Sequence, residues 1–486
     1  MRTAIVDALP DGPRTSRLQQ SIRFVRDAPG FLEECHARHG DMFTLRITGE
    51  GDWVILGHPD LAKEVFTGSP EVFHAGEGND ALLPLLGDHS VLLLDDDAHL
   101  RQRRLLLPPF HGRRMSRYGE LMEEATERQV ATWPIGEPMP TWPRLQEITL
   151  EVIMRAVFGV QDEARLDEIR RLLNTVLHRA THPLTLAMVT ALGPHRFRAL
   201  PLVRRALEPA DAAILRLIRE RRVADDLDER DDILSMLVQA TDEDGRPMGD
   251  RELRDELMTL LVAGHETTAT TLAWALERLV RHPDRLDRLR AEVLAGDDAY
   301  LDATIKETLR LRPVLALVVR KLTAPVELGG HRLPAGTRVA PCIRLIHQRP
   351  DLYPDPEAFR PERFLDTAPG TYTWIPFGGG VRRCLGASFA QFEAQRVLAT
   401  IVRRVELRAA DPAPEPFRRR AITQTPGRGA RVVVTRRDWR AAVGTTARDR
   451  GAGGDGSVST PPGVPSDDTS ATGGRRGGGS MAGTRA

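Results

Sequence analysis

The 486-residue chain has few cysteines and no net charge, and it has no long apolar run. Its three cysteines, Cys35, Cys342 and Cys384, are widely spaced, which excludes a disulfide framework and a Cys-x-x-Cys zinc pair. Lys and Arg total 68, as do Asp and Glu, so the chain lacks the basic excess of a nucleic-acid-binding protein. No apolar run reaches the ~20 residues of a membrane span, and the N-terminus does not resemble a signal peptide. We expect a soluble, cytoplasmic protein with no membrane anchor and no nucleic-acid partner.

Composition divides the chain near its C-terminus. From about residue 447 to Ala486 the sequence consists of small, polar and charged residues with almost no large apolar side chain. Such a segment cannot bury enough surface to offset the entropy of ordering. We predict a single domain over residues 1–440, followed by a disordered tail over residues 441–486.

Helical patterns dominate the predicted domain. The clearest helix covers residues 251–282, with Asp250 as its N-cap and Pro283 as its stop. Its middle, residues 257–263, is apolar on every side, so this helix should cross the molecular core.

Further helices are expected over residues 300–311 and 384–404, the second of them buried. Short strand patterns occur at residues 43–47, 53–56, 326–328, 338–341 and 431–435. The fold class is therefore mainly α with a small β region.

A glycine-rich segment over residues 377–386 leads to Cys384. We expect it to deliver this cysteine to the first turn of a buried helix, where free amide N–H groups and the positive helix end favour thiolate over thiol. Arg382 adds a cation that could pair with an anionic ligand or cofactor. Considered alone, a packed free cysteine explains Cys384 equally well.

The complete pattern is more specific. Phe377, Gly380, Arg382, Cys384 and Gly386 have the spacing of the haem-binding loop of cytochromes P450, and the chain resembles this family. The resemblance implies a long central helix over haem b, with Cys384 as the proximal thiolate ligand of the iron. A thiolate ligand favours O–O cleavage. Phe377, Gly380 and Gly386 would shape the loop, and Arg382 would contact the cofactor.

The central helix contains Ala263-Gly264-His265-Glu266-Thr267-Thr268 within buried apolar turns. Unpaired buried polar groups cost roughly 1–3 kcal/mol, so these residues need an explanation. One is a helix kink with Glu266 paired to a buried cation. The resemblance implies another, in which Ala263 and Gly264 make room over the haem while Glu266 and Thr267 pass protons to dioxygen. A zinc-protease H-E-x-x-H helix is excluded because residue 269 is Ala.

Glu307 and Arg310 stand three residues apart on a predicted helix, a spacing typical of surface ion pairs. The resemblance instead implies that they form a buried structural network with Arg363 behind the haem.

His99 and Arg103 lie one helical turn apart on the same face. A solvated basic helix would explain them, because Arg101 and Arg104 are adjacent. The resemblance implies that they donate to the haem propionates, together with Arg320.

For function, the resemblance implies a haem-thiolate monooxygenase that inserts one oxygen atom from O2 into an organic substrate. It covers about residues 25–435. Segments that line the substrate pocket in the family are here rich in Leu, Val, Ala and Thr, which favours an apolar substrate. These segments are residues 73–94, 178–200, 314–319 and 422–425.

Electrons should come from a separate ferredoxin and ferredoxin reductase, because no G-x-G-x-x-G follows a strand. A basic patch of Arg383, Arg104, Arg113 and Arg114 is the expected docking surface, and we expect a monomer. A peroxide-driven peroxygenase and a non-catalytic haem-thiolate sensor are the alternatives, but neither needs the Glu266–Thr267 pair.

Overall fold

The computed structural model describes residues 6–110, 114–160 and 162–438. These residues fall within one unit that ends at Trp439. The predicted disordered tail lies outside the described residues, so the division of the chain into a domain and a tail stays a prediction.

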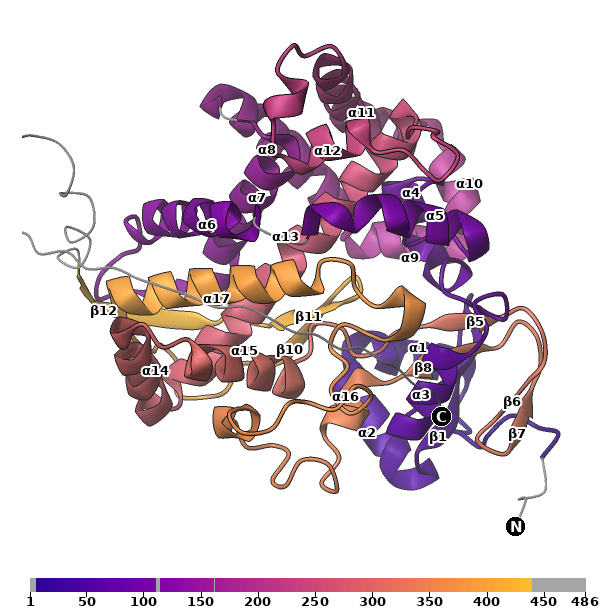
Figure 1. The fold of residues 1–486 in the computed structure, drawn as a ribbon. Coiled ribbons are helices and arrows are strands. Elements are labelled where there is room, and N and C mark those ends of the chain that lie inside the picture. Colours follow the sequence, from indigo (N-terminus) through magenta and orange to yellow (C-terminus); the bar gives the residue numbers. More distant parts are fainter. Residues whose placement is uncertain (1–5, 111–113, 161, 439–486) are drawn as a thin grey trace, which may run out of the picture. The chain divides into compact units, whose positions relative to one another are not determined.

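Helices make up most of the described chain, as predicted (Figure 1). They are α1 (Arg17–Arg26), α2 (Ala28–His39), α3 (Pro59–Thr67), α4 (Leu83–Leu86), α5 (Asp96–Leu106), α6 (Arg114–Val130), α7 (Thr141–Phe158), α8 (Glu163–Ala180), α9 (Pro183–Leu192), α10 (Pro194–Ala199), α11 (Pro201–Arg222), α12 (Ile233–Gln239), α13 (Asp250–Val280), α14 (Pro283–Ala295), α15 (Ala299–Leu311), α16 (Ile343–His347) and α17 (Ala387–Arg404). Within residues 6–110, 114–160 and 162–438, none of them is long and apolar enough to span a membrane.

The strands are short and form several small sheets. They are β1 (Met42–Ile47), β2 (Gly51–Leu56), β3 (Phe73–His74), β4 (Pro138–Pro140), β5 (Arg320–Leu322), β6 (Val326–Leu328), β7 (His331–Leu333), β8 (Arg338–Pro341), β9 (Val405–Ala409), β10 (Phe417–Arg420), β11 (Thr423–Pro426) and β12 (Arg431–Arg437). The largest sheet has the order β1-β2-β8-β5-β3, with β2 and β8 parallel, and a second has the order β4-β12-β9. The pairs β6-β7 and β10-β11 are hairpins.

The predicted central helix is confirmed as α13, with one correction at its start. Asp250 was expected to be the N-cap, but it is the first helical residue and Gly249 precedes it as the cap. Glu252 causes this shift, because its carboxylate accepts the Gly249 N–H at 2.7 Å and so satisfies a free amide of the first turn. The helix packs against α7, α11, α15 and α17.

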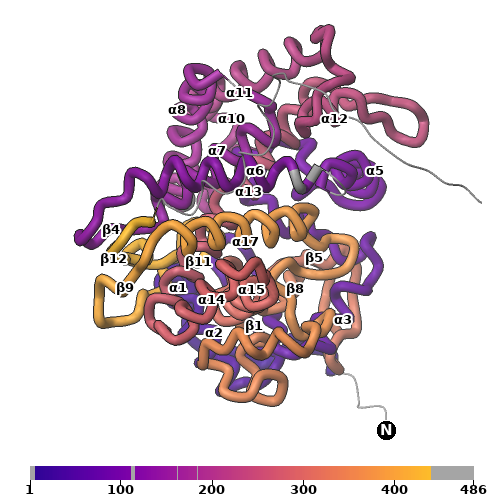
Figure 2. Tube along the Cα trace, turned by 60° about the vertical axis from the view of Figure 1, so that its left-hand side comes forward, coloured from indigo at the N-terminus to yellow at the C-terminus, as the bar shows by residue number. Residues whose placement is uncertain are grey.

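The helix after the cysteine begins later than predicted. It was expected to start at Cys384, but α17 starts at Ala387, after a short 3-10 turn over Gly380–Arg382. The Cys384 N–H donates to the Phe377 carbonyl at 3.0 Å, which closes the loop upon itself before the helix begins. In both views α17 crosses the middle of the molecule, with α7, α8 and α11 on one side and α14 and α15 on the other (Figures 1 and 2).

Candidate functional site

The loop before α17 presents Cys384 at its end. The thiol is accessible to solvent, yet protein surrounds it closely enough that burial raises its pKa above the ordinary cysteine value. The Gly386 N–H bonds to the sulfur and lowers the pKa, as do the charges of Arg103 and Arg383. The amide N–H and the two arginine charges favour thiolate, as the sequence predicts, whereas burial of the thiol opposes it.

Glycine is required at one position of this loop. Gly380 has a φ of 65°, and a Cβ there would stand 2.0 Å from the Phe66 carbonyl oxygen. Gly386 has no such neighbour within 4 Å of an added Cβ. Phe377 packs edge-on against Trp374, with ring centroids 5.9 Å apart. The loop is therefore held by close contact at Gly380 and by ring packing at Phe377.

Four basic side chains converge near the loop. His99 and Arg103 come from α5, Arg320 opens β5, and Arg382 precedes the cysteine. Burial, together with the charges of Arg382, Arg103 and Arg320, lowers the pKa of His99 to about 3. Burial, followed by the neighbouring Arg382, lowers the pKa of Arg320 to about 10.

One carboxylate serves this cluster. Asp95 accepts a hydrogen bond from the Arg382 guanidinium at 2.5 Å. Arg382, which the sequence suggested as a partner for an anionic ligand or cofactor, therefore already has a carboxylate partner. Among the described residues, neither the His99 nor the Arg103 side chain has a hydrogen bond or ion pair, and Arg320 bonds only to the Val319 carbonyl at 2.8 Å. Of these four side chains only Arg382 has a carboxylate partner, although buried cations require anionic partners.

The buried course of α13 is interrupted at the acid-threonine segment. Residues 253–261 and 268–280 are buried, whereas Ala263 is exposed and Thr267 is partly exposed. The Thr267 hydroxyl donates to the Ala263 carbonyl at 2.6 Å, which leaves its oxygen lone pairs free to accept. Ala263 and Thr267 thus border space that protein atoms do not fill.

Gly264 faces a different direction. A Cβ at this position would stand 2.9 Å from Cδ1 of Ile153 on α7. Its lack of a side chain lets α7 approach α13 closely, and a role for Gly264 beside the haem stays a prediction.

Glu266 is held by the β10–β11 hairpin. Its Oε1 accepts the Thr423 hydroxyl at 2.6 Å, and its Oε2 lies 3.7 Å from Nε of Arg420. Burial raises the pKa of Glu266, while Thr423 and Arg420 lower it. The alternative explanation of a carboxylate paired with a cation therefore describes part of the geometry, and Arg420 is that cation.

Glu307, Arg310 and Arg363 form the buried network that the resemblance implied. Two bonds of 2.7 and 2.9 Å join Arg310 to Glu307, and both side chains are fully buried. Arg363 lies 3.4 Å from Glu307, and the Arg360 N–H donates to the same carboxylate at 2.8 Å. Arg310 also donates to the carbonyl of His347.

Sequence reasoning missed Asp95 and Arg420, and it placed Thr423 only within a pocket-lining segment, without its bond to Glu266. Asp95 had a usable signal, because it lies directly before the helix that carries His99. Arg420 and Thr423 had none, since only the folded hairpin brings them to Glu266, more than 150 residues earlier in the chain.

Comparison with known proteins gives the class. The cytochrome P450 family model matches residues 10–430. A Mycobacterium tuberculosis protein named cytochrome P450 135B1 is 46% identical, over 91% of this chain and 95% of its own length. Cytochrome P450 137 of the same species is 42% identical, over 81% of this chain and 83% of its own length.

Solved structures agree. The retinoic acid bound cyanobacterial CYP120A1 has a TM-score of 0.75 and 25% identity, and covers 88% of this chain and 99% of its own. The haem domain of cytochrome P450DA has a TM-score of 0.76 and 23% identity, and covers 90% and 98%. The chain belongs to the cytochrome P450 family. Members of this family are monooxygenases that bind haem b through a cysteine thiolate and use O2 and redox partners.

The residues present fit a haem. Arg103 and Arg320 have no carboxylate partner among the described residues, and two propionates would supply that negative charge. Cys384 and Ala263 are accessible within otherwise buried surroundings.

Proposed function

We propose that Cys384 holds the haem iron as thiolate and that His99, Arg103 and Arg320 bind the propionates. The bound haem supplies the chemistry that activates O2. The unpaired state of the His99 and Arg103 side chains supports this assignment, because anions would satisfy buried donors that protein leaves free. Arg382 would contact a propionate while keeping its pair with Asp95.

We further propose that the chain inserts one oxygen atom from O2 into an apolar organic substrate. The carrying observation is the position of Glu266 and Thr267, where the burial of α13 breaks. At this point Thr267 can accept a proton, and Glu266, whose pKa burial raises, can donate one.

The segment Val314–Val319 lies beside this acid. The Gln424 N–H donates to the Val314 carbonyl at 2.8 Å, and Leu315 forms a bridge to Thr423, the residue that bonds Glu266. Apolar residues therefore lie next to the hairpin that holds Glu266, and we take them as part of the substrate approach. The retinoic acid named for the similar cyanobacterial structure is an apolar acid, which supports a substrate of this character.

Spectral binding tests the substrate class. We expect dodecanoate to shift the Soret band of the purified haem protein and a small polar aromatic compound to leave it unchanged, because the approach offers few polar partners. A shift with the polar compound alone would contradict the apolar assignment.

Oxygen consumption tests the reaction. A monooxygenase should consume O2 and form oxygenated product in equal amounts when supplied with a ferredoxin, its reductase and a substrate that binds. Product formed only with added peroxide would favour the peroxygenase, and haem without turnover would favour the sensor.

We also propose that a separate ferredoxin delivers the electrons and that the protein is a monomer. The three free cysteines favour a reducing compartment, and we therefore propose a cytoplasmic location. Arg383 is exposed beside the cysteine loop and could form the centre of a docking surface. Arg104 is exposed but paired with Glu243. Arg113 lies outside the described residues, as does the side chain of Arg114, so their part in the patch stays a prediction.

Reduction kinetics test the docking surface. Replacing Arg383→Glu should slow reduction by ferredoxin, because the change reverses charge at the docking surface, and should leave haem content unchanged. A reduction rate indifferent to this change and to salt would contradict the docking proposal.

A further inference from the structure

Asp95 lies where three segments of the chain meet beside the cysteine loop. It directly precedes α5, the helix that carries two of the proposed propionate donors. Its Oδ1 accepts the Gly76 N–H at 2.9 Å and a bond from Arg382 at 2.5 Å, and its Oδ2 accepts the Glu77 N–H at 3.0 Å. This carboxylate therefore joins the residues after β3, the start of α5 and the loop before α17.

The carboxylate does not take the role that its position would normally give it. Asp95 is the N-cap of α5, where an aspartate side chain usually accepts an amide N–H of its own helix. Within the described part of the chain its side chain makes no such bond. The next residue, Asp96, has a φ of 50°, a left-handed conformation that is strained for a residue with a side chain. The start of α5 therefore directs Asp95 toward Arg382 and away from its own helix.

The surroundings hold both members of the Asp95–Arg382 pair closely. A Cβ at Gly76 would stand 2.2 Å from the Leu93 carbonyl oxygen and 2.6 Å from Oδ2 of Asp95, so this close approach requires glycine. The side chains of Asp95 and Arg382 are only 11% and 10% exposed. Arg382 also donates to the Val91 carbonyl at 3.3 Å. A guanidinium has further N–H groups, and within the described residues these remain available for an anionic ligand.

The charges around this pair match two propionates. Arg103, Arg320 and Arg382 are positive, Asp95 is negative, and His99 is neutral near pH 7 because burial and the nearby arginines lower its pKa to about 3. These side chains together carry an excess of two positive charges, which two propionates would neutralise. Burial and the charge of Arg382 lower the pKa of Arg320 to about 10, and the charge of Asp95 opposes both effects. Asp95 therefore supports Arg320 as well as Arg382.

Other charges near Asp95 are closer to solvent. His74 lies 3.6 Å from Oδ2 of Asp95, and it also contacts Glu77 at 3.0 Å and Asp96 at 3.3 Å. Glu77 pairs in addition with Lys321 at 2.8 Å. The side chains of Glu77 and Asp96 are 46% and 48% exposed, so solvent screens their charges. Asp95 thus acts on the propionate donors from within the protein, whereas its acidic neighbours act from the surface.

We propose that Asp95 is a positioning residue that holds Arg382 for the haem propionates, supports Arg320 and thereby sets the reduction potential of the bound haem. The inference rests on the proposed function, in which these arginines bind the propionates. Reduction adds one electron, supplied by the ferredoxin in the proposed reaction, to ferric haem and gives ferrous haem. A fixed negative charge beside the propionates stabilises the ferric form, so Asp95 keeps the reduction potential lower than the arginines alone would set it.

The first test is a redox titration of the haem-containing protein, followed by its visible spectrum. Asp95→Asn should shift the reduction potential to a more positive value, because one negative charge is lost and Arg382 is left without its counter-ion. Asp97→Asn is the matched control, since Asp97 is exposed two residues further along the chain, and its potential should equal that of the parent. A potential of Asp95→Asn equal to that of the parent would overturn the proposal.

A double-mutant cycle separates positioning from the effect of charge alone. Arg382→Gln removes the cation that Asp95 holds, so Asp95→Asn should shift the reduction potential by a clearly smaller amount in this background than in the parent. Equal shifts in the two backgrounds would show that Asp95 acts on the haem only through its own charge, and would overturn the positioning role.

Haem release is a second measurement, which does not require Arg382→Gln to retain haem. Asp95→Asn should lose haem to an excess of apomyoglobin several-fold faster than the parent, because Arg382 is no longer fixed for a propionate. Asp97→Asn should release haem at the parent rate. Equal rates for all three proteins would overturn the positioning role.

Failure of this proposal differs from failure of the proposed function. A parent that binds no haem, or binds it without a strongly red-shifted carbon monoxide band, would contradict the proposed function. A parent that has this band, and whose reduction potential and haem release are unchanged by Asp95→Asn, would overturn the role of Asp95 alone.

Discussion

At the residue scale, Glu393 of α17 is a buried carboxyl group that the sequence did not single out. It is 2% exposed, and burial raises its pKa to about 8, although the neighbouring Thr268 of α13 lowers it. The group is therefore protonated in the folded protein at pH 7 and ionised in the unfolded chain.

This difference predicts how stability depends on pH. Because the folded pKa is above the unfolded value of 4.5, stability from Glu393 is complete below pH 4.5 and is lost as pH rises toward 8. Glu393→Gln should remove roughly 3–5 kcal/mol of this decline. Denaturant unfolding at pH 5, 6.5 and 8 measures it, with the exposed Glu120→Gln as control. Parallel pH profiles for parent and Glu393→Gln would contradict the assignment.

The Glu307–Arg310 pair gives a second prediction at this scale. Glu307→Gln leaves the fully buried Arg310 without its counter-ion, and should lower the free energy of unfolding by roughly 3–5 kcal/mol. Glu292→Gln removes a helix-surface pair with Arg288 and should cost below about 1 kcal/mol. Urea titrations of the two variants compare them directly, and equal losses would show that burial of the network has no energetic consequence.

Residues such as His99, Arg103 and Glu307 were predictable because each motif lies within one helical turn. Arg420 was not, because its partner Glu266 is distant in sequence and the strand that carries it has no alternating pattern. The close contact of Gly264 with α7 was not predictable either, since sequence cannot say which face of a buried helix a glycine turns toward a neighbour.

At the element scale, the β10–β11 hairpin carries Arg420 and Thr423 to Glu266. Ala421 begins its two-residue turn with a φ of 52°, a left-handed conformation that favours glycine. The hairpin therefore holds the acid through a turn with a strained residue.

Relieving this strain should stabilise the protein. Ala421→Gly should raise the free energy of unfolding by about 0.5–1 kcal/mol, as the left-handed penalty outweighs the extra entropy of glycine. Thermal unfolding of the haem-bound protein measures the change. Ile422→Gly, at the next position without a positive φ, should lower stability, and a gain there equal to that of Ala421→Gly would contradict the explanation.

Element boundaries show what sequence periodicity leaves open. The strands β1, β2, β6, β8 and β12 were predicted, whereas β3, β4, β5, β7, β9, β10 and β11 were not. Several of these have two or three residues and exist because distant segments pair with them, as β3 does with β5. The start of α17 was misplaced because a 3-10 turn and the bond from Cys384 to Phe377 precede it.

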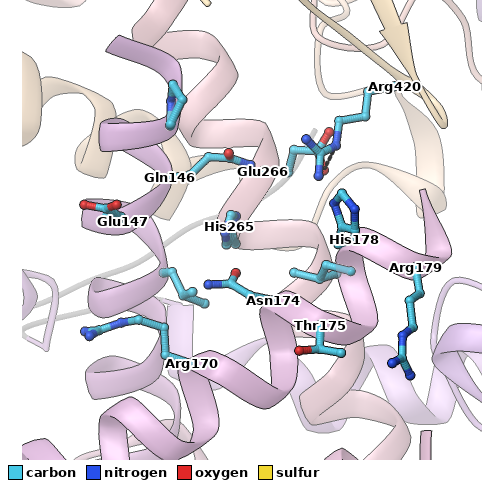
Figure 3. Close-up of a pocket in the computed structure, with 13 residues that line it drawn as sticks. Gln146, Glu147, Arg170, Asn174, Thr175, His178, Arg179, His265, Glu266 and Arg420 are labelled. Atoms are coloured by element: carbon cyan, nitrogen blue, oxygen red, sulfur yellow. Dashed lines mark ion pairs between the residues drawn. The ribbon is translucent and has the colours of Figure 1, made fainter. Parts of the chain in front are cut away.

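At the scale of the whole molecule, α13 joins the proposed functions of the site. Its apolar turns pack into the core against α7 and α17, while Thr267 borders the accessible stretch of its central turn and Glu266 lines the cavity between α7, α8 and β10 (Figure 3). The fold class followed from the sequence because these turns are apolar on every side. The surroundings of Glu266 could not be predicted from the sequence, because they require residues of four separate elements to meet.

The central claim is that Cys384 binds haem iron as thiolate, and the carbon monoxide difference spectrum of the dithionite-reduced protein tests it most directly. The parent and Cys35→Ala, which changes a buried cysteine far from the loop in sequence, should both show a strongly red-shifted Soret band. Cys384→Ala should lose it. An unshifted band in the parent, or a shifted band that persists in Cys384→Ala, would contradict the account.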